Sequence, residues 1–167
     1  MQQLRIVFRR WLRARQLPKV PAGWRWIVFD DGRVAFLAPK DYAMHRERNE
    51  TIAVYPPGEA SGVTLRFSLH THPLDLAMPC DVAEQYVIDR ATEQQLPLTR
   101  LRDRVFLTEC KESDGPARRV LMHCWQVGAG RILLVCTATI WGADRESEIV
   151  QRALRVVNQS IESLRLT

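Results

Sequence analysis

Residues 120–140, VLMHCWQVGAGRILLVCTATI, carry the strongest signal of the chain's architecture. Two runs rich in β-branched and apolar residues flank Gly128-Ala129-Gly130, which predicts two antiparallel strands joined by a tight turn. The second run, 131–140, is apolar on both faces, as is typical of a strand in the centre of a sheet. Because this Gly-Ala-Gly segment precedes a strand and not a helix, its amides are not expected to converge on a phosphate. The domain is therefore expected to be built around this hairpin.

Further strands are predicted on both sides of the hairpin. The segment 63–70 alternates, with Val63, Leu65, Phe67 and Leu69 on one side, so one of its faces should be buried. Asp31-Gly32 is a hairpin signal between two short apolar runs. The remaining predicted strands are 24–29, 33–38, 51–55, 105–111 and 119–127.

Two segments change to the period of a helix. Asp81 and Glu84 have the spacing of a capping pair before the first, and we expect the second to open at Asp144. The expected apolar face of the first comprises Val82, Ala83, Tyr86, Val87 and Ala91. The expected buried side of the second comprises Ile149, Val150, Ala153, Leu154, Val157, Ile161 and Leu164. The predicted class is α+β: a mainly antiparallel sheet of about six to seven strands with helices packed on it.

Every charge in the first 25 residues is positive. This leading part holds seven basic residues and no acid, so the rest of the chain carries −2 within a net charge of +5. Before Pro18 the spacing predicts an N-terminal amphipathic helix. We expect a basic segment at 1–22 and a single α+β domain at 23–167. The basic patch of the segment is Arg5, Arg9, Arg10 and Arg13.

The apolar stripe of this helix needs a cover. We expect it to pack on the body of the protein or on a second copy, and two alternatives stay open: an anionic membrane surface and a groove of a partner protein. Nucleic acid is disfavoured because apolar residues occupy the face that a broad basic patch would need. No apolar secretory region follows the arginines, so a cytoplasmic protein is expected, with an organellar transit peptide as the alternative.

Histidines and cysteines give few candidates for chemistry. His70 and His72 share one side of a predicted strand and are weak metal candidates, but Pro73 interrupts the strand there. No cysteine forms a C-x-x-C pair, and we expect reduced thiols, with Cys110, Cys124 and Cys136 in the core. Either Cys110 or Cys136 has the strand position to pair with His123 across the sheet.

No sequence motif of a known catalytic site is present. We therefore expect no enzyme activity, no catalytic residue, no metal and no cofactor. Aromatic residues are the better candidates, because tryptophan is enriched at binding hot spots. The candidate partner-binding residues are Phe8, Trp11, Trp24, Trp26, Trp125 and Trp141.

The body resembles the PsbP-like α/β fold. The similarity spans about residues 24–165 and rests on arrangement: Phe36-Leu37-Ala38-Pro39 before a strand, the run Leu65-Arg66-Phe67-Ser68 before the first helix, the paired strands 120–140, and a closing helix ending in 160–164. This superfamily includes photosystem extrinsic subunits and bacterial adaptor chaperones for type VI secretion effectors. The resemblance implies a module that binds other molecules without catalysis.

Three functions follow from these observations. The first is a chaperone- or adaptor-like module that holds a protein segment, such as an apolar helix, with a homo-oligomer as an open alternative. The second is a membrane-surface protein tethered by its basic helix. The third, weaker one is a small-ligand or metal-binding protein that uses His70 and His72.

Overall fold

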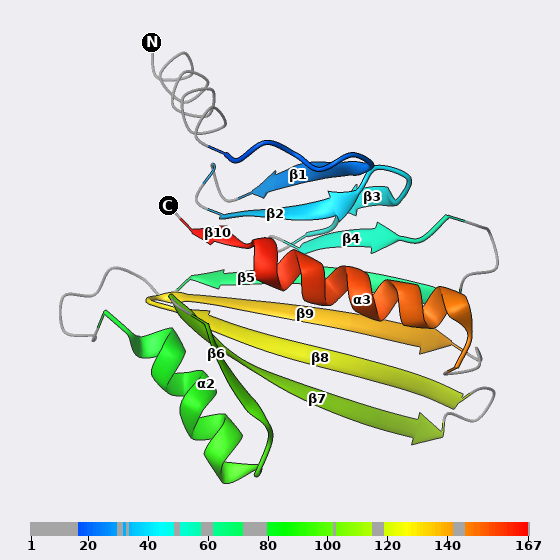
Figure 1. The fold of residues 1–167 in the computed structure, drawn as a ribbon. Helices are drawn as coiled ribbons and strands as arrows, with labels where there is room; N and C mark the ends of the chain where they lie inside the picture. Colours follow the sequence, from blue (N-terminus) through cyan, green and yellow to red (C-terminus); the bar gives the residue numbers. More distant parts are fainter. Residues whose placement is uncertain are drawn as a thin grey trace.

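The computed structural model describes residues 17–29, 32, 34–48, 51–57, 62–71, 80–101, 103–114, 119–141 and 146–166. Within them the chain forms ten strands in two sheets and two helices (Figure 1). The elements are β1 (Trp24–Phe29), β2 (Val34–Pro39), β3 (Ala43–Arg46), β4 (Thr51–Tyr55), β5 (Val63–Thr71), α2 (Val82–Glu93), β6 (Leu98–Leu101), β7 (Arg104–Asp114), β8 (Arg119–Ala129), β9 (Ile132–Trp141), α3 (Glu148–Ser163) and β10 (Arg165–Leu166).

The larger sheet has seven antiparallel strands in the order β3-β4-β5-β9-β8-β7-β6. The decisive hairpin is confirmed: β8 and β9 pair from Val120 with Trp141 down to Ala129 with Ile132. Gly130 sits in the turn with φ +56°, a left-handed conformation that glycine adopts at little cost. β9 is the central strand of the sheet, as its two apolar faces predicted.

Helix α3 covers one face of this sheet and forms the main core with it. The alternation of β5 is confirmed, since Val63, Leu65, Phe67 and Leu69 are all buried. Phe67 stacks on Phe36 of β2, with ring centroids 4.3 Å apart. The side of α3 that faces this core presents Val150, Ala153, Val156, Val157, Ser160 and Ile161.

Two details of α3 differ from the prediction. Its N-cap is Ser147, whose side chain accepts from the Val150 N–H, while Asp144 lies outside the described residues. Ile149 was expected on the buried side, and this was wrong, because it lies in the first turn and is 46% exposed. The core contact of the helix therefore begins one residue later, at Val150.

Helix α2 covers the opposite face of the sheet, over β7 and β8. Its buried residues are Ala83, Val87 and Ala91, a narrow stripe spaced four residues apart. Tyr86 falls outside this stripe and is 46% exposed, so its expected burial was wrong. The stripe is narrow because the helix comes very close to the sheet: a Cβ placed on Gly128 would lie 2.4 Å from the Ala83 carbonyl oxygen.

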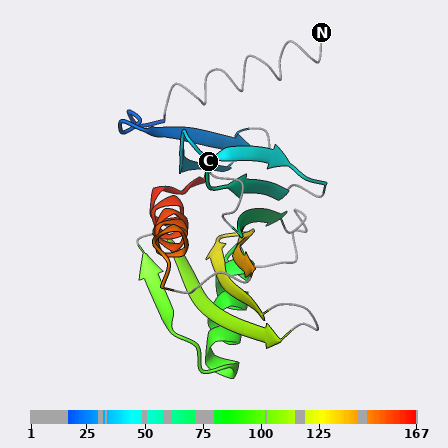
Figure 2. The same cartoon turned by 90° about the vertical axis from the view of Figure 1, so that its right-hand side faces the viewer.

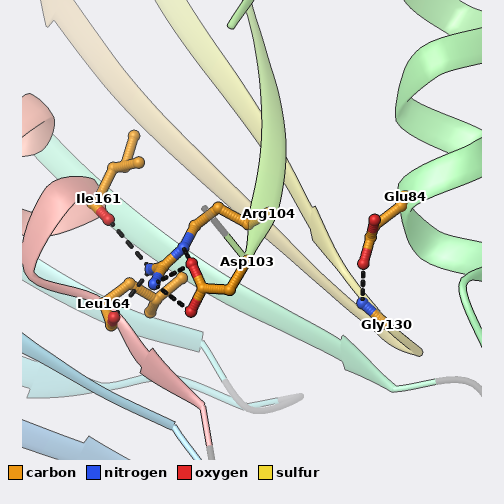
Figure 3. Close-up of polar contacts among 6 residues, drawn as sticks. All are labelled: Glu84, Asp103, Arg104, Gly130, Ile161 and Leu164. Atoms are coloured by element: carbon orange, nitrogen blue, oxygen red, sulfur yellow. Dashed lines mark hydrogen bonds and ion pairs between the residues drawn. The ribbon is translucent and has the colours of Figure 1, made fainter. Parts of the chain in front are cut away.

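The predicted capping pair at the start of α2 does not form. Asp81 occupies the N-cap position without a side-chain capping bond. Glu84 instead points to the sheet, where its Oε1 atom accepts a hydrogen bond of 2.8 Å from the Gly130 N–H (Figure 3). The Ala83 N–H donates to the Gly130 carbonyl at 2.9 Å, so two hydrogen bonds join α2 to the β8–β9 turn.

The smaller sheet has the order β1-β2-β10 and lies at the end of the molecule opposite α2 (Figure 2). One edge of β2 is paired with β1, and β10 covers only Val34 and Ala35 of its other edge. Helix α3 completes this edge: the Ser163 hydroxyl accepts from the Leu37 N–H, and the Ser160 hydroxyl donates to the Leu37 carbonyl, both at 2.8 Å. Two serines thus replace strand hydrogen bonds and hold β2 beside α3.

Arg104 fixes the carboxyl end of α3. This residue is buried, with 4% of its surface exposed. Its Nη1 atom donates to the carbonyl oxygens of Leu164 at 2.8 Å and Ile161 at 3.4 Å (Figure 3). The Asp103 carboxylate accepts two further hydrogen bonds from this arginine, at 2.7 and 2.8 Å. The buried cation is therefore paired, and it satisfies carbonyl groups that the end of a helix leaves free.

The predicted α+β class and antiparallel sheet are confirmed. The short strands β3, β6 and β10 were not predicted, and the first hairpin belongs to a separate small sheet. The amphipathic helix before Pro18 and its basic patch lie in residues 1–16, outside the described part of the chain.

Candidate functional site

A concave surface lies between α3 and the first hairpin. Two adjoining cavities, of about 410 and 450 Å³, share Trp24 and Gln159 and together form what we call the α3 groove. The residues that α3 contributes fall three or four apart and so share one face of the helix. They are Arg152, Arg155, Val156, Gln159, Glu162 and Ser163.

The opposite wall of the groove comes from the first hairpin and the segments around it. Trp24, the first residue of β1, is half-buried and pairs with Pro39. Leu37 and Pro21 line the second cavity beside it. The two walls are held together by the bonds from Leu37 to Ser160 and Ser163, so the groove is built on fixed elements. Around Trp24 the hairpin wall is apolar and includes an indole, which suits a hydrophobic side chain.

Charge is distributed unevenly along the groove. The first cavity is lined by Lys40, Arg152 and Arg155 and by one carboxylate, Asp41. Asp41 accepts from Arg152 at 2.9 Å, and both side chains are about half exposed. Within the described residues, Lys40 and Arg155 form no ion pair. This end of the groove is therefore positive and suits a carboxylate or another anion.

Tyr42 lies beneath the basic end of the groove. Its ring is buried, and the Arg152 guanidinium carbon lies 5.7 Å from the ring centroid. Burial raises the pKa of the phenol, and the charges of Arg152 and Arg155 oppose this shift. Among the described residues the hydroxyl has no hydrogen-bond partner. Tyr42 thus remains neutral near pH 7 and supports Arg152 from below.

A third, smaller cavity lies between β1 and β3. It measures about 200 Å³ and includes Trp26, Val28 and Met44. Val28 and Met44 are 41% and 50% exposed, and β3 is an edge strand of the larger sheet. The Trp26 Nε1–H donates to the Pro18 carbonyl at 3.0 Å, so the chain entering β1 partly covers this indole.

The structure separates the tryptophans predicted to bind a partner. Trp24 lies in the α3 groove and Trp26 in the smaller cavity. Trp141 is 51% exposed at the end of β9, away from both. Trp125 is 3% exposed, and its Nε1–H donates to Asn158 at 3.1 Å, so it is a core residue with no accessible surface for a partner. Phe8 and Trp11 lie outside the described residues.

Of the two histidines proposed as metal ligands, the structure describes only His70. His70 is exposed near the end of β5, and His72 lies outside the described residues. No group of three or more potential metal ligands occurs among the residues placed here. His123 does approach a thiol: its Nε2 atom lies 3.7 Å from Sγ of Cys110, its cross-strand neighbour. All four cysteines are free thiols, and Cys110 is exposed, so its expected place in the core was wrong.

Sequence reasoning missed most of the groove. Lys40, Arg155 and Gln159 carried no local signal, because they are polar residues on a turn and on the outer face of a helix. Of the predicted partner-binding residues, only Trp24 pointed toward this groove. The helices placed here include none with the length and apolarity that a bilayer span requires.

Comparisons with known proteins define the fold further. No protein-family model matches the chain, and no curated protein matches it. A protein of Bacteroides thetaiotaomicron VPI-5482 with a known crystal structure superposes with a TM-score of 0.65 at 12% identity. That match covers 87% of this chain and 49% of the other, so the chain spans about half the length of that protein.

The solution structure of cyanobacterial PsbP (CyanoP) from Synechocystis sp. PCC 6803 also matches. The identity is 12%, the coverage is 89% of this chain and 95% of that one, and the TM-score is 0.38. At 12% identity the Bacteroides match shows the fold alone, and the CyanoP match, with a TM-score of 0.38, supports no conclusion about this chain.

Proposed function

We propose that this protein is a non-enzymatic binding module that holds an amphipathic helix of another protein in the α3 groove. One observation carries the proposal: an apolar wall around Trp24 runs beside α3 and ends in a group of cations with a single carboxylate. Such a groove fits a segment with an apolar face and an acidic residue near one end.

The dimensions of the groove favour a helix as the occupant. Its α3 wall extends from Arg152 to Ser163, which corresponds to about 16 Å, or three turns, at 1.5 Å per residue. A second helix packed on α3 at the usual distance of roughly 8–10 Å would place apolar side chains every three or four residues against Trp24 and Leu37. A carboxylate at its end would meet Lys40 and Arg155.

Peptide selection tests this directly. The full chain is used to select from a phage library of random 16-residue peptides, and the winners are titrated against it by tryptophan fluorescence. We expect enriched peptides with apolar residues at helical spacing and an acid near one end. Gln159→Trp should block the groove, and Arg155→Glu should remove its attraction for acids, each weakening binding by about tenfold or more.

Glu93→Trp is the matched control, because it adds the same bulk at an exposed position on α2. Binding should be unchanged in this variant. The proposal fails if selection yields no binder, or if the binders are insensitive to both groove substitutions. It also fails if the full chain binds anionic phosphatidylserine vesicles while showing no groove-dependent peptide binding, which would favour the membrane-surface alternative.

A further inference from the structure

Cys110 and His123 form an exposed pair on the sheet. They stand directly opposite each other on β7 and β8, so their side chains emerge on the same face, and Sγ and Nε2 lie 3.7 Å apart. Cys110 is exposed to solvent and His123 is half-buried. The distance lies within hydrogen-bond range for sulfur, so the imidazole can accept the proton of the thiol.

The imidazole is held in place by its neighbours. Its ring stacks on that of Trp125, with centroids 5.9 Å apart and an angle of 25° between planes. The buried indole is itself anchored by its hydrogen bond to Asn158 of α3. The base of the pair is therefore supported from the core, while the thiol faces solvent. Such an arrangement differs from a cysteine that is merely exposed.

The other cysteines lack this combination. Cys124 is buried on the opposite face of β8, and burial raises the pKa of its thiol. Cys136 is fully buried, and burial raises its pKa well above the ordinary value. Cys80 is exposed, but no described imidazole lies within hydrogen-bond distance of it. Among the residues that the structure describes, exposure and a neighbouring imidazole coincide only at Cys110.

We propose that Cys110 is a modification site that forms mixed disulfides with small disulfide compounds. His123 takes the thiol proton, and the thiolate attacks one sulfur of the disulfide. A bond forms between the Cys110 sulfur and that sulfur, the original S–S bond breaks, and the departing thiolate takes the proton from the imidazolium. One thiol and one disulfide thus give one mixed disulfide and one free thiol, with no other oxidant.

Site-resolved kinetics test the proposal. The reduced full chain is incubated with oxidised glutathione under native conditions, quenched with acid, and analysed by peptide mass spectrometry. We expect Cys110 to react about tenfold faster than Cys80, because only Cys110 has a described imidazole, 3.7 Å away, that can take the thiol proton as the sulfur attacks. Cys136 should stay unmodified in every folded sample and so reports unfolding in the same experiment.

Two variants of His123 distinguish the effect of the imidazole base on the reaction rate of Cys110 from the effect of solvent access. His123→Phe keeps a ring over Trp125, whereas His123→Asn opens more space beside the thiol. Both substitutions should slow mixed-disulfide formation at Cys110 by about tenfold and leave the rate at Cys80 unchanged. The proposal is overturned if Cys110 reacts no faster than Cys80, or if its rate is retained in the asparagine variant. Neither residue of the pair lines the α3 groove, so these results are distinguishable from those of peptide binding.

Discussion

The carboxylate of Glu84 accepts a hydrogen bond of 2.8 Å from the backbone N–H of Gly130. This contact joins the first turn of α2 to the turn of the central hairpin, across 46 residues of sequence. The reciprocal bond from the Ala83 N–H to the Gly130 carbonyl makes the joint a closed pair. Glu84, whose spacing predicted a helix-capping role, thus links α2 to the sheet instead.

Removing the carboxylate should loosen α2. We expect Glu84→Ala to lower the free energy of unfolding by about 1–2 kcal/mol, because a charged acceptor is lost from a half-buried donor. Glu84→Gln keeps an oxygen acceptor and should lose less. Urea denaturation measures both, with the exposed Glu93→Ala on the same helix as control. Equal stabilities of the Glu84→Ala and Glu93→Ala variants would show that the hydrogen bond from Gly130 to Glu84 does not stabilise the fold.

Gly128 is expected to tolerate no side chain. A Cβ there would meet the Ala83 carbonyl oxygen at 2.4 Å and the Glu84 Cα at 2.9 Å, and both are backbone atoms of a docked helix. Gly128→Ala should therefore cost about 3 kcal/mol by overpacking. Gly23→Ala is the comparison: its φ of +79° strains an alanine by about 1–2 kcal/mol, but its Cβ would meet open space. Urea denaturation measures both losses of stability. A smaller loss for Gly128→Ala than for Gly23→Ala would contradict the close packing of α2 on β8.

The sequence allowed the central hairpin and both helices to be predicted because their signals are local. Alternation, two-sided apolarity and a glycine turn lie within residues 120–140, and they determine the antiparallel pair and its place in the sheet. The capping prediction failed because a glutamate at that spacing has a competing partner, Gly130, that only the tertiary fold supplies. Ile149 and Tyr86 were misassigned because periodicity does not show where a helix overhangs its sheet.

The site was much less predictable. Lys40 and Arg155 face one groove only because β2 is tied to α3 through Ser160 and Ser163, and nothing near Lys40 signals this. The Cys110–His123 pair was foreseen as one of two options, since strand faces follow from sequence. The choice between Cys110 and Cys136 required the register of β7 against β8, which no local pattern determines.

Arg104 should be among the costliest residues to truncate. Arg104→Ala leaves the carbonyl oxygens of Leu164 and Ile161 without their donor and Asp103 without its partner. We expect a loss of about 2–4 kcal/mol, and Arg104→Lys should recover little, because an ammonium cannot reproduce the planar fork. The exposed Arg100→Ala should change stability by less than about 0.5 kcal/mol. Thermal and urea unfolding of the three variants measure these losses. The prediction is wrong if Arg104→Ala loses no more stability than Arg100→Ala.

The ion pair between Asp103 and Arg104 predicts that the free energy of unfolding depends on pH. Hydrogen bonds from Arg104 lower the pKa of Asp103 below its ordinary 3.8. The folded carboxyl therefore binds its proton less readily than the unfolded one, and it adds stability above pH 3.8 that is lost as pH falls through the lowered value. Wild type should exceed Asp103→Asn in stability at about pH 6, and the gap should close toward about pH 2–3. A gap that is constant over this range would exclude the linkage.

The hydrogen bond from the Leu37 N–H to Ser163 yields a prediction for one amide. Leu37 directs this N–H away from β1, and the Ser163 hydroxyl is its acceptor at 2.8 Å. Ser163→Ala should therefore speed hydrogen exchange at the Leu37 amide, by about tenfold for a loss of about 1.4 kcal/mol in local opening. Ser160→Ala removes the donor to the carbonyl of the same residue and should affect that amide less, while Glu162→Ala should not affect it. Residue-resolved exchange by NMR measures all three. If Ser163→Ala leaves this amide protected, β2 is held against α3 by packing alone, and the groove wall does not depend on the serine.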